Sequence, residues 1–154
     1  MTSEHLLHTI PPIYDRNSKI LILGSFPSVK SREVSFYYGH PQNRFWRVLA
    51  AVLGCAVPSS NEEKTALLQS HNIALWDVIK SCDIVGSSDS SIKNVVPNDI
   101  GVILSSCGIR QIYSNGKTSE KLFNKYIKDT VGRDTVALPS TSPANASYNL
   151  ERLT

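Results

Sequence analysis

A short apolar run at residues 20–23, Ile-Leu-Ile-Leu, constrains the fold of this chain more than any other feature. Its residues do not alternate with polar ones, which is the pattern of a strand covered on both faces in a parallel sheet. A turn of small residues follows directly, Gly24-Ser25-Phe26-Pro27-Ser28. Because open α/β sheets bind ligands outside the carboxyl ends of their strands, we expect a central strand over residues 19–23 with a ligand site immediately after it.

Two amphipathic or capped helices are predicted next. Apolar residues recur at intervals of three and four over residues 45–53, and Gly54 stands at the usual stop position. Ser60 and Glu63 have the spacing of a capping box, which predicts a short helix that ends at about Gln69.

Strands and helices continue to alternate towards the C-terminus, and this alternation predicts a parallel sheet between helical layers. The predicted elements are a strand from Ile73 to Asp77, a helix after Asn98 or Asp99, a strand over residues 109–114, a helix after residues 115–118 and a strand over residues 135–138.

Two segments lack a regular pattern. Residues 1–18 contain Pro11 and Pro12 and are predicted to form an irregular lead-in to the first strand. Residues 83–96 include Gly86 and a run of Ser and Asp, a composition that is typical of loops. Long loops in compact domains are often functional, so we expect this one to rim the site.

Length and composition indicate a single soluble domain over residues 1–154, with a formal net charge of +3. No apolar run approaches the roughly 20 residues of a membrane-spanning helix, and the N-terminus lacks the basic flank of a secretory signal. Cys55, Cys82 and Cys107 form no Cys-x-x-Cys pair, which disfavours a zinc or thiol redox site. We therefore expect a cytoplasmic monomer. Its mildly basic charge is compatible with a polyanionic partner but does not establish one.

Three segments of the chain resemble the uracil-DNA glycosylase superfamily. The His-Pro-x-Asn-Arg-Phe-Trp motif is similar to the mismatch-specific uracil-DNA glycosylases. Gly-Ser-Phe-Pro together with Ser-Thr-Ser-Pro-Ala-Asn is most similar to the hypoxanthine-DNA glycosylase branch, also called DNA-deoxyinosine glycosylases. The segments are Gly24-Ser25-Phe26-Pro27, Gly39-His40-Pro41-Gln42-Asn43-Arg44-Phe45-Trp46-Arg47-Val48 and Leu138-Pro139-Ser140-Thr141-Ser142-Pro143.

This resemblance implies a three-layer α/β/α sandwich with a four-stranded parallel sheet. It also implies excision of a deaminated base from double-stranded or single-stranded DNA, in base excision repair, without a metal or other cofactor. Hypoxanthine is the expected base, with uracil or xanthine as further substrates. The motifs contain no obvious lysine nucleophile, so we expect a monofunctional glycosylase that does not cleave the strand.

The sequence departs from its relatives at three positions. In the mismatch-specific branch an Asn of the first turn holds the attacking water, and Phe26 stands there in this chain. Other branches begin the last motif with His or Asn, where this chain has Ser140, and the wedge position often taken by Leu is Ala144. These departures argue against efficient uracil removal.

Asn43, in the best-matched motif, is our candidate for holding the water, and Ser140 is assigned to the same catalytic centre. An Asn does not remove a proton at neutral pH. Its carbonyl can nevertheless hold a water beneath the anomeric carbon, where sugar hydrolysis develops cationic character. The alternative is that Asn43 only caps the helix over residues 45–53, because Asn is preferred at that place.

Base binding is assigned to Gly24, Ser25, Phe26, Tyr38 and Asp77. The resemblance implies that Tyr38 is the aromatic platform for the flipped base. Phe26 is expected to shape the floor of the pocket, although Tyr38 and its aromatic neighbours could instead be core residues. An ionised Asp77 only accepts hydrogen bonds, which suits the N1–H of hypoxanthine and not the lone pair of adenine N1. A capping or turn Asp after a strand is the alternative.

Contacts to DNA are assigned to polar and basic residues of these motifs. Hydroxyls and backbone amides of the last motif can bind phosphates, and the residues after it can press into the duplex as the base leaves. Solvated surface charge is the alternative for each basic residue. The residues assigned here are Arg44, Lys117, Thr141, Ser142, Pro143, Ala144 and Asn145.

Two other functions are compatible with the sequence. A non-enzymatic DNA-binding relative would fit the missing amide at Phe26 and the Ser at position 140. A hydrolase of free nucleosides would fit a site too closed for DNA. Release of base from DNA, or from a free nucleoside, distinguishes them.

Overall fold

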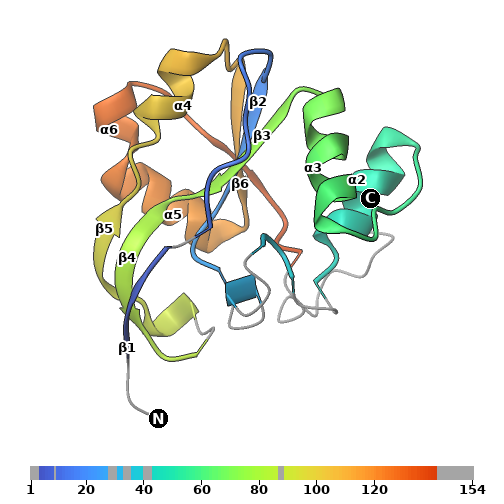
Figure 1. Cartoon of the computed structure of the whole chain (residues 1–154). Coiled ribbons are helices and arrows are strands. Elements are labelled where there is room, and N and C mark those ends of the chain that lie inside the picture. The colour runs from blue at the N-terminus through green and yellow to red at the C-terminus, as the bar shows by residue number, and fades with distance from the viewer. Residues whose placement is uncertain are drawn as a thin grey trace.

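A four-stranded parallel sheet forms the centre of the protein (Figure 1). The computed structural model describes residues 4–8, 10–27, 31–32, 36–39, 43–86 and 89–141, and every structural statement below concerns these residues. The strand order is β3-β2-β6-β7. The strands are β2 (Ile20–Gly24), β3 (Ile73–Asp77), β6 (Gln111–Asn115) and β7 (Val136–Leu138).

Helices cover both faces of this sheet, as predicted (Figure 1). Leu21 and Leu23 of β2 are fully buried and share one core cluster with Phe123, while Ile22 shares another with Phe45. This confirms that the first strand is covered on both sides, in a three-layer α/β/α sandwich. In the part of the chain that is described, no helix has the length and apolar character to cross a membrane. One face carries α2 (Phe45–Leu53) and α3 (Asn61–Ser70), and the other carries α4 (Gly101–Ser106), α5 (Lys117–Tyr126) and α6 (Lys128–Val131).

A second, antiparallel sheet corrects two of the sequence predictions. It has the order β1-β4-β5 and consists of β1 (Glu4–Leu7), β4 (Ile79–Ile84) and β5 (Lys93–Pro97). The predicted irregular lead-in therefore contains a strand, and the predicted loop over residues 83–96 contains parts of two. Its Gly and Ser composition describes only the connection, which includes a 3₁₀ turn at Asp89–Ser91. Short edge strands with Lys and Pro carry little periodic signal, which explains both errors.

The topology of the parallel sheet places a crevice beside the central strand. After β2 the chain passes to β3 on one side, and after β3 it returns to β6 on the other side of β2. The carboxyl ends of β2 and β6, at Gly24 and Asn115, therefore flank a topological switch point, where open α/β sheets bind their ligands. Asp77 ends the neighbouring strand β3.

The capping box of α3 allows a first prediction. Ser60 Oγ accepts a hydrogen bond from the Glu63 N–H at 3.1 Å, and the Glu63 carboxylate accepts one from the Ser59 N–H at 2.7 Å. The Ser59 N–H lowers the pKa of Glu63. Ser60→Ala is expected to reduce the free energy of unfolding by about 1 kcal/mol, because the Glu63 N–H loses its partner. Urea denaturation measures this, and an unchanged midpoint would show that the cap contributes nothing.

Candidate active site

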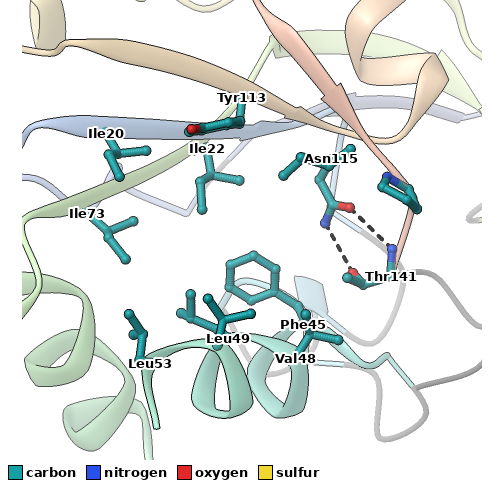
Figure 2. Close-up of a pocket in the computed structure, with 13 residues that line it drawn as sticks. Ile20, Ile22, Phe45, Val48, Leu49, Leu53, Ile73, Tyr113, Asn115 and Thr141 are labelled. Carbon is teal, nitrogen blue, oxygen red and sulfur yellow. Dashed lines mark hydrogen bonds between the residues drawn. The ribbon is translucent and has the colours of Figure 1, made fainter. Parts of the chain in front are cut away.

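Side-chain hydrogen bonds join Asn43, Thr141 and Asn115 beyond the carboxyl end of β6. The Thr141 hydroxyl donates to Asn43 Oδ1 at 2.9 Å and accepts from Asn115 Nδ2 at 3.1 Å. The Thr141 N–H donates to Asn115 Oδ1 at 3.2 Å (Figure 2). The Thr141 carbonyl accepts from the Arg44 N–H at 3.1 Å. The motif before α2 and the motif after β7 are therefore brought together, as their predicted common function requires.

Asn43 also binds the start of the helix that follows it. Its Oδ1 accepts a second hydrogen bond, from the N–H of Phe45, the first residue of α2, at 2.9 Å. The N-cap residue is Arg44, whose side chain makes no capping hydrogen bond, so Asn43 reaches the helix from the position before the cap. The capping interpretation is therefore right about the contact and wrong about the position, and the catalytic role stays a prediction. Both lone pairs of this carbonyl oxygen are occupied in the structure, one by a backbone donor and one by the Thr141 hydroxyl.

Tyr38 lies against the start of α2 in an unusual backbone conformation. Its φ of 52° falls in the left-handed region, which bulky residues rarely adopt outside functional or strained sites. Its ring stacks on Phe45 with centroids 4.1 Å apart and 20° between the planes. The predicted platform thus has one face covered by the protein, so a base can stack only on the opposite face. Burial raises the pKa of the Tyr38 phenol, and the charge of Asp77 adds to this effect.

Asp77 is buried at the end of β3, with 4% of its surface exposed. Its Oδ2 accepts a hydrogen bond from His8 Nε2 at 2.8 Å. Its backbone carbonyl accepts one from Asn98 Nδ2 at 2.9 Å, so Asn98 fixes the end of β3 and is not the cap of α4 that the sequence suggested. A Cβ on Gly24 would collide with Asp77 Oδ1, so only glycine leaves the space that this carboxylate occupies.

The other residues assigned to the base pocket, Ser25 and Phe26, contact the antiparallel sheet. Phe26 packs in the core cluster of the antiparallel sheet, and its ring meets the edge of the His8 ring at a centroid distance of 6.0 Å. Ser25 is half-buried, and its carbonyl accepts a hydrogen bond from the Ile79 N–H at 3.1 Å. Neither observation tests the predicted contact with a base.

The residues predicted to contact DNA are only partly described. Ser140 lies against Gly116, whose Cβ, if present, would stand 3.0 Å from Ser140 Cβ. Arg44 is half-buried before α2, and Lys117 is exposed as the first residue of α5. Thr141 is buried within the asparagine network, and its predicted phosphate contact stays a prediction. Ser142, Pro143, Ala144 and Asn145 lie outside the described residues.

An apolar cavity of about 340 Å³ lies between α2 and the sheet, next to the asparagine network (Figure 2). Aliphatic side chains of β2 and α2 dominate its lining, for example Ile22, Leu49 and Leu53, and Asn115 and Thr141 stand at one end. This lining offers few partners to the hydrogen-bonding edge of a base. We therefore place the candidate site in the polar group formed by Gly24, Asp77 and Tyr38, with the network of Asn43, Thr141 and Asn115 beside it.

Metal chemistry was not predicted from the sequence. Among the residues that the structure describes, no group of three or more His, Cys, Asp or Glu side chains is arranged to bind a metal ion.

Two residues of the site were missed in the sequence. His8 belongs to no recognised motif and is distant in the sequence from the turns that contain the motifs. The pairing of β1 with β4 brings it to Asp77. Asn115 was placed in a strand-to-helix turn, but its role as the partner of Thr141 was not foreseen. Its position at the end of a predicted parallel strand was the available signal.

The comparisons with known proteins agree with this geometry. The chain is similar to two proteins named "Hypoxanthine DNA glycosylase". The one from Methanosarcina barkeri is 36% identical over 137 residues, or 88% of this chain and 85% of the relative. The one from Methanosarcina acetivorans is 35% identical over 144 residues, or 92% of this chain and 90% of the relative.

A solved structure is similar over the same range. It is a solution NMR structure, from Methanosarcina acetivorans, of a protein described as a candidate uracil DNA glycosylase, with a TM-score of 0.80 and 34% identity over 94% of this chain and 89% of that chain. The family model described as "Uracil DNA glycosylase superfamily" matches residues 11–154. With its motifs after β2, at the start of α2 and after β7, the chain belongs to the uracil DNA glycosylase superfamily.

Proposed function

We propose that this protein is a monofunctional DNA glycosylase that hydrolyses the N-glycosidic bond of a deaminated base, hypoxanthine first, after that base has left the DNA stack. The observation that carries this proposal is the buried carboxylate of Asp77, which His8 holds at the end of β3 beside Gly24. The names of the two curated relatives support the same substrate. Repair of deaminated adenine in DNA is the corresponding cellular role.

Asp77 supplies the distinction between hypoxanthine and adenine. Hypoxanthine carries a hydrogen on N1, whereas adenine presents a lone pair there. An ionised carboxylate can only accept hydrogen bonds, so it binds the first and repels the second. The Asp77 carboxylate needs such a donor, because buried charges are costly unless they are paired and hydrogen-bonded. Uracil and xanthine each have a ring N–H as well, in their case between two carbonyl groups. Because Asp77 can accept from this N–H, both bases are proposed as further substrates.

Asn43 holds the attacking water in this mechanism. A water on its carbonyl must replace one of the two donors seen in the structure. The Phe45 N–H is fixed by the helix, while the Thr141 hydroxyl can rotate, so the Thr141 hydroxyl is the exchangeable partner. The water oxygen then bonds to the anomeric carbon, and the electrons of the glycosidic bond leave with the base. The proton that the water loses is released to solvent, and the departing base anion takes one up, so that a neutral base and a sugar hydroxyl result. The backbone phosphates of the substrate favour the developing positive charge on the sugar.

One assay tests this function. Matched duplexes and single strands containing hypoxanthine, uracil, xanthine or a thymine mismatch, and free inosine, are incubated with the protein, and released base is quantified. Hypoxanthine is expected to leave DNA fastest. Tight duplex binding without release would indicate the non-enzymatic relative, and release from inosine alone a nucleoside hydrolase. Strand cleavage with a borohydride-trapped intermediate would contradict the monofunctional assignment.

A further inference from the structure

His8 and Asp77 form a pair that is sealed from solvent. The His8 side chain is 2% exposed and the Asp77 side chain 6% exposed, and Nε2 lies 2.8 Å from Oδ2. An ionised carboxylate has no hydrogen to give, so the imidazole donates. The contact joins two distant parts of the chain, because His8 follows β1 whereas Asp77 ends β3.

The imidazole of His8 is held on several sides. Its own backbone N–H donates to the Lys80 carbonyl in β4 at 2.7 Å, which continues the pairing of β1. The ring meets Phe26 edge-on, and it meets the tilted ring of Tyr37, each at a centroid distance of 6.0 Å. The Tyr37 hydroxyl in turn donates to the Pro11 carbonyl at 2.8 Å. A side chain this constrained can fix the direction of the hydrogen bond that it donates.

The two oxygens of Asp77 therefore have different surroundings. Oδ2 is bound by His8, and Oδ1 lies against Gly24, where a Cβ would collide with it. The same absent Cβ would stand 3.1 Å from the Tyr38 hydroxyl. That hydroxyl is buried, and hydrogen bonding with the Asn115 side chain acts against burial by lowering its pKa. The titratable groups that act on or face Asp77 in the described part of the chain are His8, Tyr37 and Tyr38, and its charge adds to the effect of burial in raising the pKa of both tyrosines.

We propose that His8 is a specificity-determining positioning residue, which holds Oδ2 of Asp77 and thereby keeps Oδ1 turned towards the N–H of the flipped base. This inference rests on the proposed function of Asp77. Without the imidazole, the carboxylate loses the donor that fixes its orientation at the end of β3, and Oδ1 is no longer held towards the edge of the base. His8 thus protects the discrimination against the undamaged base.

A second pair provides a matched control. His5 lies in β1, just before His8 in the chain, and its Nδ1 lies 2.8 Å from Asp83 Oδ1, the same distance as in the buried pair. The His5 side chain, however, is 62% exposed, and exposed pairs of this kind contribute little. Loss of the imidazole at position 5 removes a similar contact without affecting Asp77.

The test compares His8→Phe, His8→Gln and His5→Phe in single-turnover excision of hypoxanthine and of adenine from matched duplexes. His8→Phe keeps an aromatic ring and loses the donor, and its rate of hypoxanthine release is expected to fall by about 10-fold or more. Its preference for hypoxanthine over adenine should narrow as well, because Oδ1 is no longer held towards the base. The amide of His8→Gln can donate from nearly the same place and should restore most of the rate. His5→Phe should behave as the wild type.

Carbon NMR of the Asp77 carboxyl at neutral pH, in the same three variants, does not depend on activity. The carboxyl resonance should move in His8→Phe and return towards its wild-type position in His8→Gln. An unmoved resonance, or a loss of rate that His8→Gln does not restore, overturns the proposal. A moved resonance in a protein that releases no base supports the contact of His8 with Asp77 and overturns the glycosylase function instead.

Discussion

Asn43→Ala is expected to reduce the excision of hypoxanthine by about 100-fold or more, since a misplaced reactant commonly costs that much. Its Oδ1 is bonded both to the start of α2 and to the segment after β7. Loss of the amide therefore removes the group assigned to the water and loosens the two motifs around it.

The same variant is also expected to lose stability. The Phe45 N–H loses its acceptor, and the Thr141 hydroxyl loses one of its two partners. Each loss typically costs about 1 kcal/mol. A smaller rate could then result from a loosened helix alone, and a variant that keeps the cap is needed to separate the two effects.

Asn43→Ser provides this separation. Serine caps helices about as well as asparagine, but its hydroxyl is shorter and carries no amide. We expect Asn43→Ser to unfold at nearly the same urea concentration as the wild type and to remain as inactive as Asn43→Ala. Activity that follows stability through both variants would instead make Asn43 a capping residue only. Single-turnover rates at saturating protein, beside urea denaturation, measure both quantities.

The fold could be predicted where burial of one or both faces of an element gives its apolar residues a recognisable spacing in the sequence. Residues 20–23 are covered on both faces and lack polar interruptions, and the face of α2 that carries Phe45 repeats every three or four residues. By contrast, β1 is short and mostly exposed, and β5 is an edge strand that contains Lys93 and Pro97. Such strands are specified by their partner in space and not by their own pattern.

The site could be predicted where a residue belongs to a motif. Asn43 was assigned from a motif, Tyr38 from its spacing to that motif and Asp77 from its place after a strand. Each lies at the start of α2 or at the carboxyl end of the sheet, and their roles stay predictions. His8 could not be found, because nothing near it in the sequence points to Asp77. The contact exists only because β1 pairs with β4, a register that depends on long-range packing.

Asp77→Asn is expected to reverse the preference between hypoxanthine and adenine. The His8 N–H requires an acceptor, so the amide should turn its carbonyl oxygen to His8 and its NH₂ group to the side of Gly24. A donor then stands where the wild type presents an acceptor. This donor cannot form a hydrogen bond with the N1–H of hypoxanthine, which is also a donor, but it can donate to the lone pair of adenine N1. Hydrogen bonds to a charged group contribute enough that hypoxanthine excision should fall by roughly 10- to 100-fold.

The matched control is Asp83→Asn, which makes the same change in the exposed pair with His5 and should leave both rates unchanged. Competition between hypoxanthine-containing and undamaged duplexes, with the released bases separated and quantified, measures the preference directly.

An unaltered preference in Asp77→Asn would mean that the amide keeps its oxygen towards the base, which requires His8 to accept instead of donate. Combining Asp77→Asn with His8→Phe resolves that case. Without the imidazole, nothing described in the structure orients the amide, so a preference that still does not change would remove Asp77 from base recognition altogether.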